Sequence, residues 1–397
     1  MDTRLGKIYS IILCISMCIS MYVFSFFDSL PIVYLLYILF SFAFMIRCLK
    51  SNNIKVNITP IVLIIFLVLL SVINILFSSD ISFSSNVIIN SGKMLIWGLI
   101  LTFSIPYIDK KKFYKFLYYF SLATTLYLFV QSVFFYGFSI SLSNVFDIGF
   151  IKFKTLDMGT LTSIYRPSSF FAEPIDYSNF TIICIVLSLF DEDYKKIINK
   201  KVLIFYILSV LLCASTTGIF ILLMVLAIYE FKESKKNFKI LIVSLFFVLP
   251  VAIYIYFNYE SILLSLGSVG KTLYNTINKL TYSSSSSRIG GSYDRLELLS
   301  PVRFIFGYGI GNEYVLTNNI PQYMNTITRS IYQFGLFGSI IVLFFFVKNF
   351  FKMKNNVSKI LILITLIECF TSNILFSISN IFFFSIIFIC NKKNEGD

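Results

Sequence analysis

Long apolar runs, separated by short segments rich in lysine and arginine, follow one another along most of the chain. In the first half each run approaches the roughly 20 residues that an α-helix needs to cross about 30 Å of hydrocarbon. These runs predict membrane spans at about 8–27, 30–46, 58–77, 88–107, 113–136 and 175–190. The first has a basic flank but no small-residue cleavage site, so we expect a retained helix rather than a signal peptide.

Two later apolar runs, 202–229 and 360–390, have lysines on both sides. Lysine and arginine favour the cytoplasmic side, so a run with two lysine flanks should enter the membrane and return. Polar residues at the middle of each run offer a turn: Ser215-Thr216-Thr217-Gly218 in the first and Thr371-Ser372-Asn373 in the second. Each run therefore predicts two short helices joined by a turn.

Ordinary spans at 238–257 and 325–347 complete the pattern. The fold class is then all-α, a single polytopic membrane domain over 1–397 with about 12 transmembrane helices and both termini cytoplasmic. Ten full spans is the alternative, but it would place the lysine cluster at 232–239 on the non-cytoplasmic side, against this preference of lysine. Two long non-cytoplasmic loops remain, 137–176 and 258–324. The short alternating strands of an outer-membrane barrel are not seen.

Composition supports a membrane protein and excludes some chemistry. Of the 397 residues, 57% are hydrophobic and only 13% are charged, about half the charge of a soluble protein. The net charge of +13 comes mostly from lysines and arginines at helix ends, where they orient the protein and meet anionic lipid, so no nucleic acid partner is expected. The chain has no histidine, which excludes imidazole bases and histidine metal sites.

The first long loop ends in the segment Arg166-Pro167-Ser168-Ser169-Phe170-Phe171-Ala172-Glu173-Pro174, which is charged and bounded by prolines. Arg166 is a candidate ligand for phosphate, because a guanidinium binds phosphate oxygens through two parallel hydrogen bonds. Glu173, among apolar neighbours, is a candidate general base, and Asp176 is a second one. The plain alternative is an ion pair that anchors the loop.

Other cations could meet the same anionic group. Lys93 lies inside the fourth predicted span, where it either reaches the outer headgroups or neutralises a diphosphate at the membrane surface. The second loop adds Arg288, Arg295 and Arg303, for which a solvated face is the plain alternative. A segment at 307–311, Gly-Tyr-Gly-Ile-Gly, follows no βαβ unit, so its glycines indicate a turn or a close approach to the backbone rather than a dinucleotide site.

Taken together, these features resemble the Wzy-type polymerases, the O-antigen and capsular repeat-unit polymerases of the O-antigen polymerase/ligase superfamily. The resemblance rests on the twelve-helix pattern and on four motifs: Arg-x-Ser-Ser-Phe-Phe-x-Glu-Pro at 166–174, Ser-Thr-Thr-Gly at 215–218, Gly-x-Gly-x-Gly-Asn at 307–312 and Gln-Phe-Gly-Leu-Phe-Gly at 333–338. The Arg-x10-Gly spacing described for some polymerases is imperfect here, because eleven residues separate Arg295 from Gly307.

The resemblance implies a metal-independent, cofactor-free glycosyltransferase of the bacterial inner membrane. Such an enzyme polymerises undecaprenyl-diphosphate-linked oligosaccharide repeat units into surface polysaccharide, O-antigen or capsule, at the outer face. Its partners would be these polyprenyl-linked oligosaccharides and membrane lipid, with a chain-length regulator and a flippase as candidate protein partners. Ligases of the superfamily typically carry a histidine in the second loop, so a ligase-like transferase is a weaker alternative. A polysaccharide flippase or transporter is another, although no internal repeat is seen.

Overall fold

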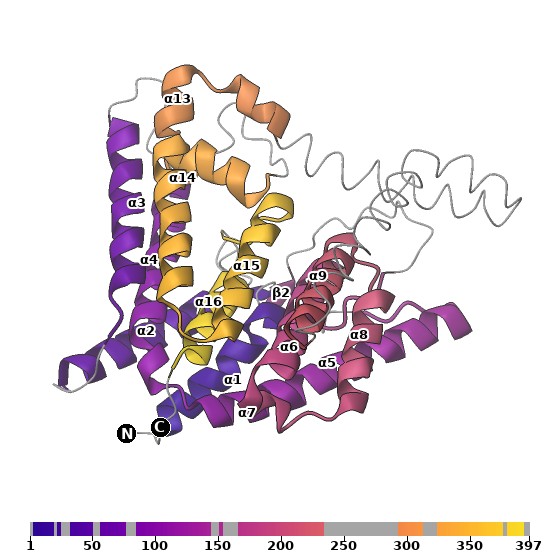
Figure 1. Cartoon of the computed structure of the whole chain (residues 1–397). Helices are drawn as coiled ribbons and strands as arrows, with labels where there is room; N and C mark the ends of the chain where they lie inside the picture. Colours follow the sequence, from indigo (N-terminus) through magenta and orange to yellow (C-terminus); the bar gives the residue numbers. More distant parts are fainter. Residues whose placement is uncertain are drawn as a thin grey trace, which may run out of the picture.

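The computed structural model describes residues 3–19, 22–24, 32–50, 56–76, 85–143, 151–153, 166–233, 293–312, 324–375 and 379–392. This part of the chain is almost entirely helical, and five of its helices are long and apolar enough to cross a membrane: α2, α3, α4, α5 and α14. The protein is therefore a helical membrane protein (Figure 1). The predicted span 238–257 lies outside the described residues.

The elements follow the predicted spans closely. The helices are α1 (Thr3–Ile19), α2 (Ile32–Lys50), α3 (Thr59–Leu76), α4 (Ser85–Phe103), α5 (Lys110–Phe138), α6 (Pro174–Phe190), α7 (Glu192–Lys195), α8 (Lys200–Leu212), α9 (Thr216–Glu233), α13 (Pro301–Phe306), α14 (Thr326–Lys352), α15 (Asn356–Thr371) and α16 (Ser379–Cys390). Short 3-10 turns η1 (Ile105–Tyr107) and η3 (Asp294–Leu298) and an antiparallel pair of strands, β1 (Tyr22–Phe24) and β2 (Ile151–Phe153), complete the described elements.

Two sequence predictions differ from the structure. The first span was expected to be helical to residue 27, but α1 ends at Ile19 and 22–24 pair as a strand with 151–153. The pattern of apolar and polar residues at 293–306 predicts one short amphipathic helix, but η3 and α13 are separate there, because Ser300 caps a new helix that has Pro301 at its first position. Proline is favoured there since it has no N–H to leave unpaired.

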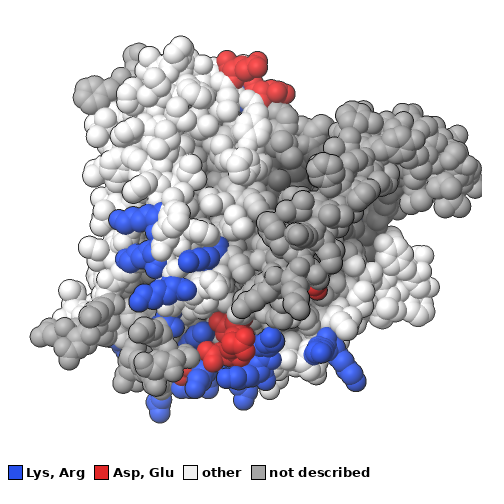
Figure 2. Space-filling view, viewed as in Figure 1, with Lys and Arg blue, Asp and Glu red and all other residues white. Residues whose placement is uncertain are grey.

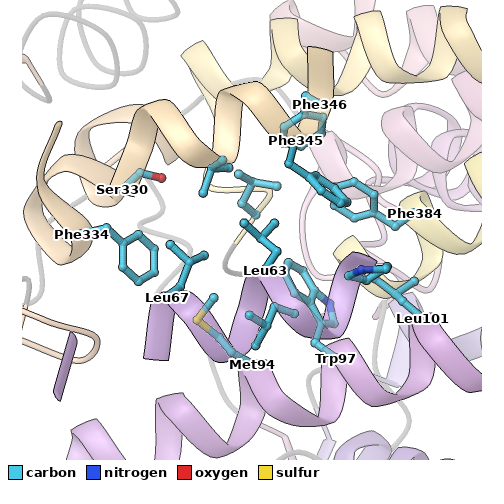
Figure 3. A pocket seen from close by; sticks show the side chains of 14 residues that line it. Leu63, Leu67, Met94, Trp97, Leu101, Ser330, Phe334, Phe345, Phe346 and Phe384 are labelled. Atoms are coloured by element: carbon cyan, nitrogen blue, oxygen red, sulfur yellow. The ribbon is translucent and has the colours of Figure 1, made fainter. Parts of the chain in front are cut away.

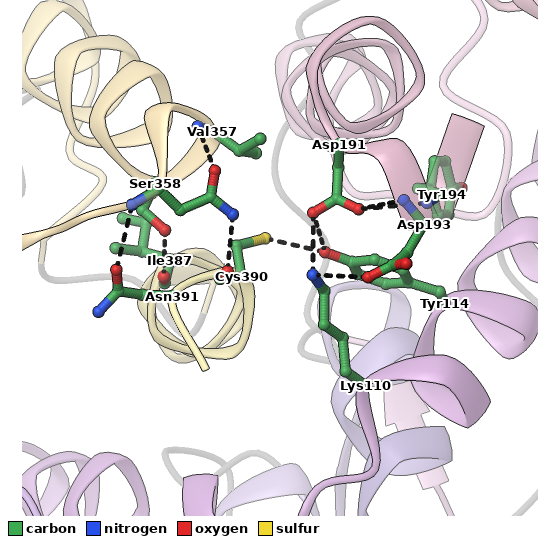
Figure 4. Close-up of polar contacts among 11 residues, drawn as sticks. Lys110, Tyr114, Asp191, Asp193, Tyr194, Val357, Ser358, Ile387, Cys390 and Asn391 are labelled. Atoms are coloured by element: carbon green, nitrogen blue, oxygen red, sulfur yellow. Dashed lines mark hydrogen bonds and ion pairs between the residues drawn. The ribbon is translucent and has the colours of Figure 1, made fainter. Parts of the chain in front are cut away.

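Helix ends rich in lysine gather at one end of the molecule, which also holds both chain termini (Figures 1 and 2). Lys110, at the start of α5, pairs with Asp191 and Asp193 at 3.2 and 3.1 Å. Tyr114 donates to Asp191 at 2.8 Å and lies 3.2 Å from the Cys390 sulfur (Figure 4). This lysine-rich end thereby joins the start of α5, the end of α6 and the end of α16.

Both lysine-flanked apolar runs contain two helices, as the sequence predicts. Helices α8 and α9 are separated by Cys213, Ala214 and Ser215, and Ala214 has a φ of 50°. Helix α9 starts beside Ser178 of α6 and ends beside Phe190, whereas α8 ends near Ser178, so α8 and α9 run in opposite directions. Similarly, the start of α15 meets the end of α16, where the Asn355 amide donates to the Cys390 carbonyl at 2.8 Å.

Helix α6 is the centre of the described fold. From Pro174 to Phe190 every residue except Asp176 is buried. Phe171, just before the helix, packs against Tyr177 and Phe180 with ring centroids 5.7 and 5.2 Å apart. A helix that is apolar on all sides needs neighbours on all sides, and α5, α8, α9 and α15 supply them.

Helix α14 is broken at Gly335, whose φ is 68°. The carbonyls of Tyr332 and Gln333 instead accept hydrogen bonds from the N–H groups of Tyr308 and Gly309, at 2.7 and 2.8 Å. A Cβ at Gly335 would overlap the Ile305 carbonyl oxygen, so only glycine fits this crossing. The glycine segment (307–311) therefore allows close packing against backbones of the protein itself, whereas the sequence favoured a turn or the close approach of a ligand.

Candidate functional site

The loop before α6 is held by its serines and phenylalanines. The Ser169 N–H donates to the Gln131 side chain of α5 at 2.8 Å, and its hydroxyl donates to the Thr124 carbonyl at 2.6 Å. Phe170 stacks on Tyr127 with centroids 4.3 Å apart. Phe171 is fully buried. These contacts anchor the loop on α5, a task for which the sequence analysis gave an ion pair of Glu173 as the plain alternative to catalysis.

The charged residues at the end of this loop and at the start of α6 lie near different parts of the structure. Arg166 is half-buried and lies within electrostatic reach of Cys213, at the turn between α8 and α9. Glu173 is the residue at which α6 begins, and Asp176 lies in the first turn, where a helix favours negative charge. Asp176 is also within electrostatic reach of Glu368, a fully buried carboxylate of α15. The two candidate bases therefore stand at the start of the central helix, close to a third acid.

Lys93 lines a cavity of about 420 Å³ between α4 and the first half of α14. We call it the polar cavity, because Arg329, Gln333 and Asn90 line it too. The Lys93 ammonium lies 5.8 Å from the centre of the Tyr34 ring, a cation–π distance. The other lining residues are Tyr34, Met94, Trp97, Ile310 and Leu375. Two cations and two amides in one cavity can bind an anion through charge-assisted hydrogen bonds.

A second cavity, of about 520 Å³, adjoins the polar cavity. We call it the apolar cavity, because Ser330 contributes the only hydroxyl to its lining; Figure 3 shows its lining side chains pointing inward from α3, α4, α14 and α16. Met94, Trp97 and Leu375 line both cavities. A cavity with cationic lining therefore lies next to a cavity with apolar lining.

Helix periodicity explains how each helix contributes to this site. On α4, Asn90, Lys93, Met94 and Trp97 follow the spacing i, i+3, i+4, i+7 and so share one face. On the first half of α14, the pair Arg329 and Gln333 faces the polar cavity, whereas the neighbouring pair Ser330 and Phe334 faces the apolar one. The break at Gly335 then turns the chain so that Phe345 and Phe346 line the apolar cavity too.

The remaining predicted arginines do not line either cavity. Arg303 lies 5.1 Å from the Tyr308 ring and donates to the Gly307 carbonyl at 3.4 Å, so it closes the end of its own short helix. The backbone carbonyl of Arg295 accepts from the Tyr332 hydroxyl at 2.6 Å, which holds η3 against α14. Arg288 lies outside the described residues. Of the predicted phosphate ligands that the structure describes, Lys93 alone lines the polar cavity.

Three residues of interest were missed by the sequence analysis: Arg329, Gln333 and Glu368. A signal for them exists, because an ionisable residue inside an apolar run is by default a candidate functional residue. Arg329 and Glu368 both lie in predicted membrane segments, and Gln333 lies one turn from Arg329. Their signal is weaker than that of the loops, because each is a single polar residue inside a long apolar run.

Among the described residues, no group of three or more histidine, cysteine, aspartate or glutamate side chains comes together that could hold a metal ion. The described cysteines form no disulfide; Cys184 and Cys213, for example, are buried, whereas Cys48 is half-buried. The chain was also compared with known proteins. No protein-family model, curated protein or solved structure matches it.

Proposed function

We propose that this chain is a membrane glycosyltransferase that polymerises lipid-linked oligosaccharide repeat units into a surface polysaccharide. The observation that supports this most is the adjacent pair of cavities, one lined by Lys93, Arg329 and Gln333 and the other by apolar side chains. A donor that carries its glycan on a polyprenyl diphosphate has matching parts, an anionic group next to a long hydrocarbon.

The reaction needs few groups, because the donor brings its own leaving group. A hydroxyl oxygen of the acceptor sugar bonds to the anomeric carbon of the donor, and the bond from that carbon to the diphosphate oxygen breaks. The diphosphate leaves with the electron pair, which cations such as Lys93 and Arg329 stabilise. The hydroxyl proton passes to a carboxylate, for which Glu173 and Asp176 are our candidates. Orienting two lipid-held substrates supplies most of the remaining acceleration.

The topology that accompanies this function is twelve membrane helices with both termini cytoplasmic, in the bacterial inner membrane. Two features support it: the lysine-rich end gathers both termini, and the pairs α8–α9 and α15–α16 run out and back. The loop holding Arg166 and Glu173 lies at the opposite end of α6 from Asp191. Under the positive-inside rule, that loop faces away from the cytoplasm.

The transporter alternative has one observation in its favour. Glu368 is fully buried and within electrostatic reach of Asp176, and buried acid pairs inside membranes serve as proton relays in transporters. A flippase would use such a pair to couple export of the lipid-linked unit to proton flow.

Deleting the gene in the cell that carries it separates these functions. Loss of a polymerase leaves single repeat units on the carrier lipid at the outer face or on the cell surface. Loss of a flippase traps those units on the cytoplasmic face. Labelling with a membrane-impermeant sugar oxidant, followed by analysis of the lipid-linked glycans, measures the side directly. Trapped cytoplasmic units would overturn the polymerase proposal in favour of the transporter.

A further inference from the structure

We infer that the apolar cavity holds the hydrocarbon tail of the same lipid whose phosphate group is bound in the polar cavity. The inference rests on the proposed function for the nature of the lipid, a polyprenyl diphosphate. It adds that the first part of the tail lies inside the protein, between α3, α4 and α14, rather than in the surrounding bilayer.

Adjacency of the two cavities is the first argument. Met94, Trp97 and Leu375 each line both cavities, so the cavities lie on either side of the same three side chains, and a lipid that occupied both would pass along these side chains. The polar cavity has a cationic lining, which matches the phosphate group of a lipid. The apolar cavity, on the other side of the shared residues, matches the hydrocarbon tail.

The order of the residues along the helices gives the tail a direction. On α4 the polar cavity uses Asn90 and Lys93, and the apolar cavity continues to Leu101. At 1.5 Å per residue, Lys93 and Leu101 are about 12 Å apart along the helix. Helix α4 leads into η1, beside the lysine-rich end. The phosphate group therefore lies farther from that end, and the tail extends toward it.

Trp97 makes the inference measurable, because it is the only tryptophan of the chain. It borders both cavities, so its fluorescence reports on their occupation. We would titrate the full-length protein, in phosphatidylcholine nanodiscs, with farnesyl diphosphate and separately with inorganic diphosphate. Both probes should change the Trp97 emission in a saturable way, and farnesyl diphosphate should bind at least about tenfold more tightly, since each buried CH₂ contributes about 0.8 kcal/mol.

A matched pair of variants on α3 separates the cavity from the bilayer. Leu67 is buried and lines the apolar cavity, whereas Leu69 is 55% exposed on the outer surface of the same helix. Leu67→Phe should weaken farnesyl diphosphate binding about tenfold and leave inorganic diphosphate binding unchanged, which also shows that the variant is folded. Leu69→Phe should change neither.

Two results would overturn the inference. One is equal binding of both probes to the unchanged protein, and the other is a Leu67→Phe variant that binds farnesyl diphosphate as tightly as Leu69→Phe does. No step of the test measures polymerisation. If the protein is a polymerase but the lipid tail stays in the bilayer, this binding test fails and the polymerisation test succeeds. If the protein is not a polymerase, the binding test can still succeed.

Discussion

Charged side chains serve two different purposes in the two halves of this molecule. At the lysine-rich end, Lys110 is nearly buried and is held by Asp191 and Asp193, and Tyr114 completes the network (Figure 4). Around the polar cavity, Lys93 and Arg329 border an open volume together with two amides. The first arrangement joins helix ends to one another, whereas the second lines a cavity in which, under the proposed function, the diphosphate of a ligand binds.

This comparison teaches that the role of a charged side chain in a membrane protein depends on its surroundings, which are either an oppositely charged partner or a cavity. Breaking a buried ion pair leaves an uncompensated charge, so substitutions at the lysine-rich end should reduce stability. Removing a cation from the wall of the polar cavity removes positive charge that a bound anion would need, so substitutions there should reduce function at unchanged abundance. Each prediction below tests one side of this difference.

The largest effect is expected in the loop before α6. Glu173→Gln should lower polymer formation more than about 100-fold, the usual contribution of a general base. Arg166→Lys should also fail if the guanidinium binds phosphate through two bonds, because an ammonium cannot reproduce that geometry. Polymer length on gels and protein abundance in membranes are the two measurements. Full polymer production by either variant would reduce that residue to a structural role.

A smaller effect, on stability alone, is expected at the lysine-rich end. Asp191→Ala removes the partner of Lys110 and of the Tyr114 hydroxyl, and should lower the free energy of unfolding by about 3 kcal/mol. Thermal unfolding of the purified protein in detergent measures this change. Any residual folded protein should keep its specific activity.

An exposed pair at the same end provides the control. Lys112 and Asp109 lie 3.3 Å apart with side chains 51% and 45% exposed. Lys112→Ala should cost less than about 0.5 kcal/mol, since exposed ion pairs contribute little. Equal destabilisation by Asp191→Ala and Lys112→Ala would contradict the view that burial makes the Lys110 network important.

Much of the fold was predictable from the sequence, because hydrophobic length and lysine flanks act locally. The break after Thr371 falls at the predicted polar residues, whereas the break at 213–215 lies just before the predicted turn 215–218, whose last three residues open α9. The strand at 22–24 was not predictable, since it depends on pairing with a segment more than 100 residues away. The position of the helix break at Gly335 likewise depends on Tyr308 and Gly309, which come from a separate part of the chain.

The site was predictable only in part. Lys93 was selected from the sequence as a cation of interest, and it lines the polar cavity, but its neighbours Arg329 and Gln333 come from a helix that lies more than 200 residues later. Their meeting depends on how α4 and α14 pack, which no local pattern encodes. The loop residues Arg166, Glu173 and Asp176 remain predictions as functional groups, and Arg295 and Arg303 are held in contacts within the second loop region and with α14.

The central claim is that the polar cavity binds the diphosphate of a lipid-linked donor. The most direct test is polymerisation by purified protein in vesicles supplied with lipid-linked single repeat units, without nucleotide sugar or ATP. The unchanged protein should produce a ladder of polymers, with EDTA present as well as absent. The double variant Lys93→Ala/Arg329→Ala, inserted to the same level, should produce none. A ladder of equal intensity from the double variant would contradict the account.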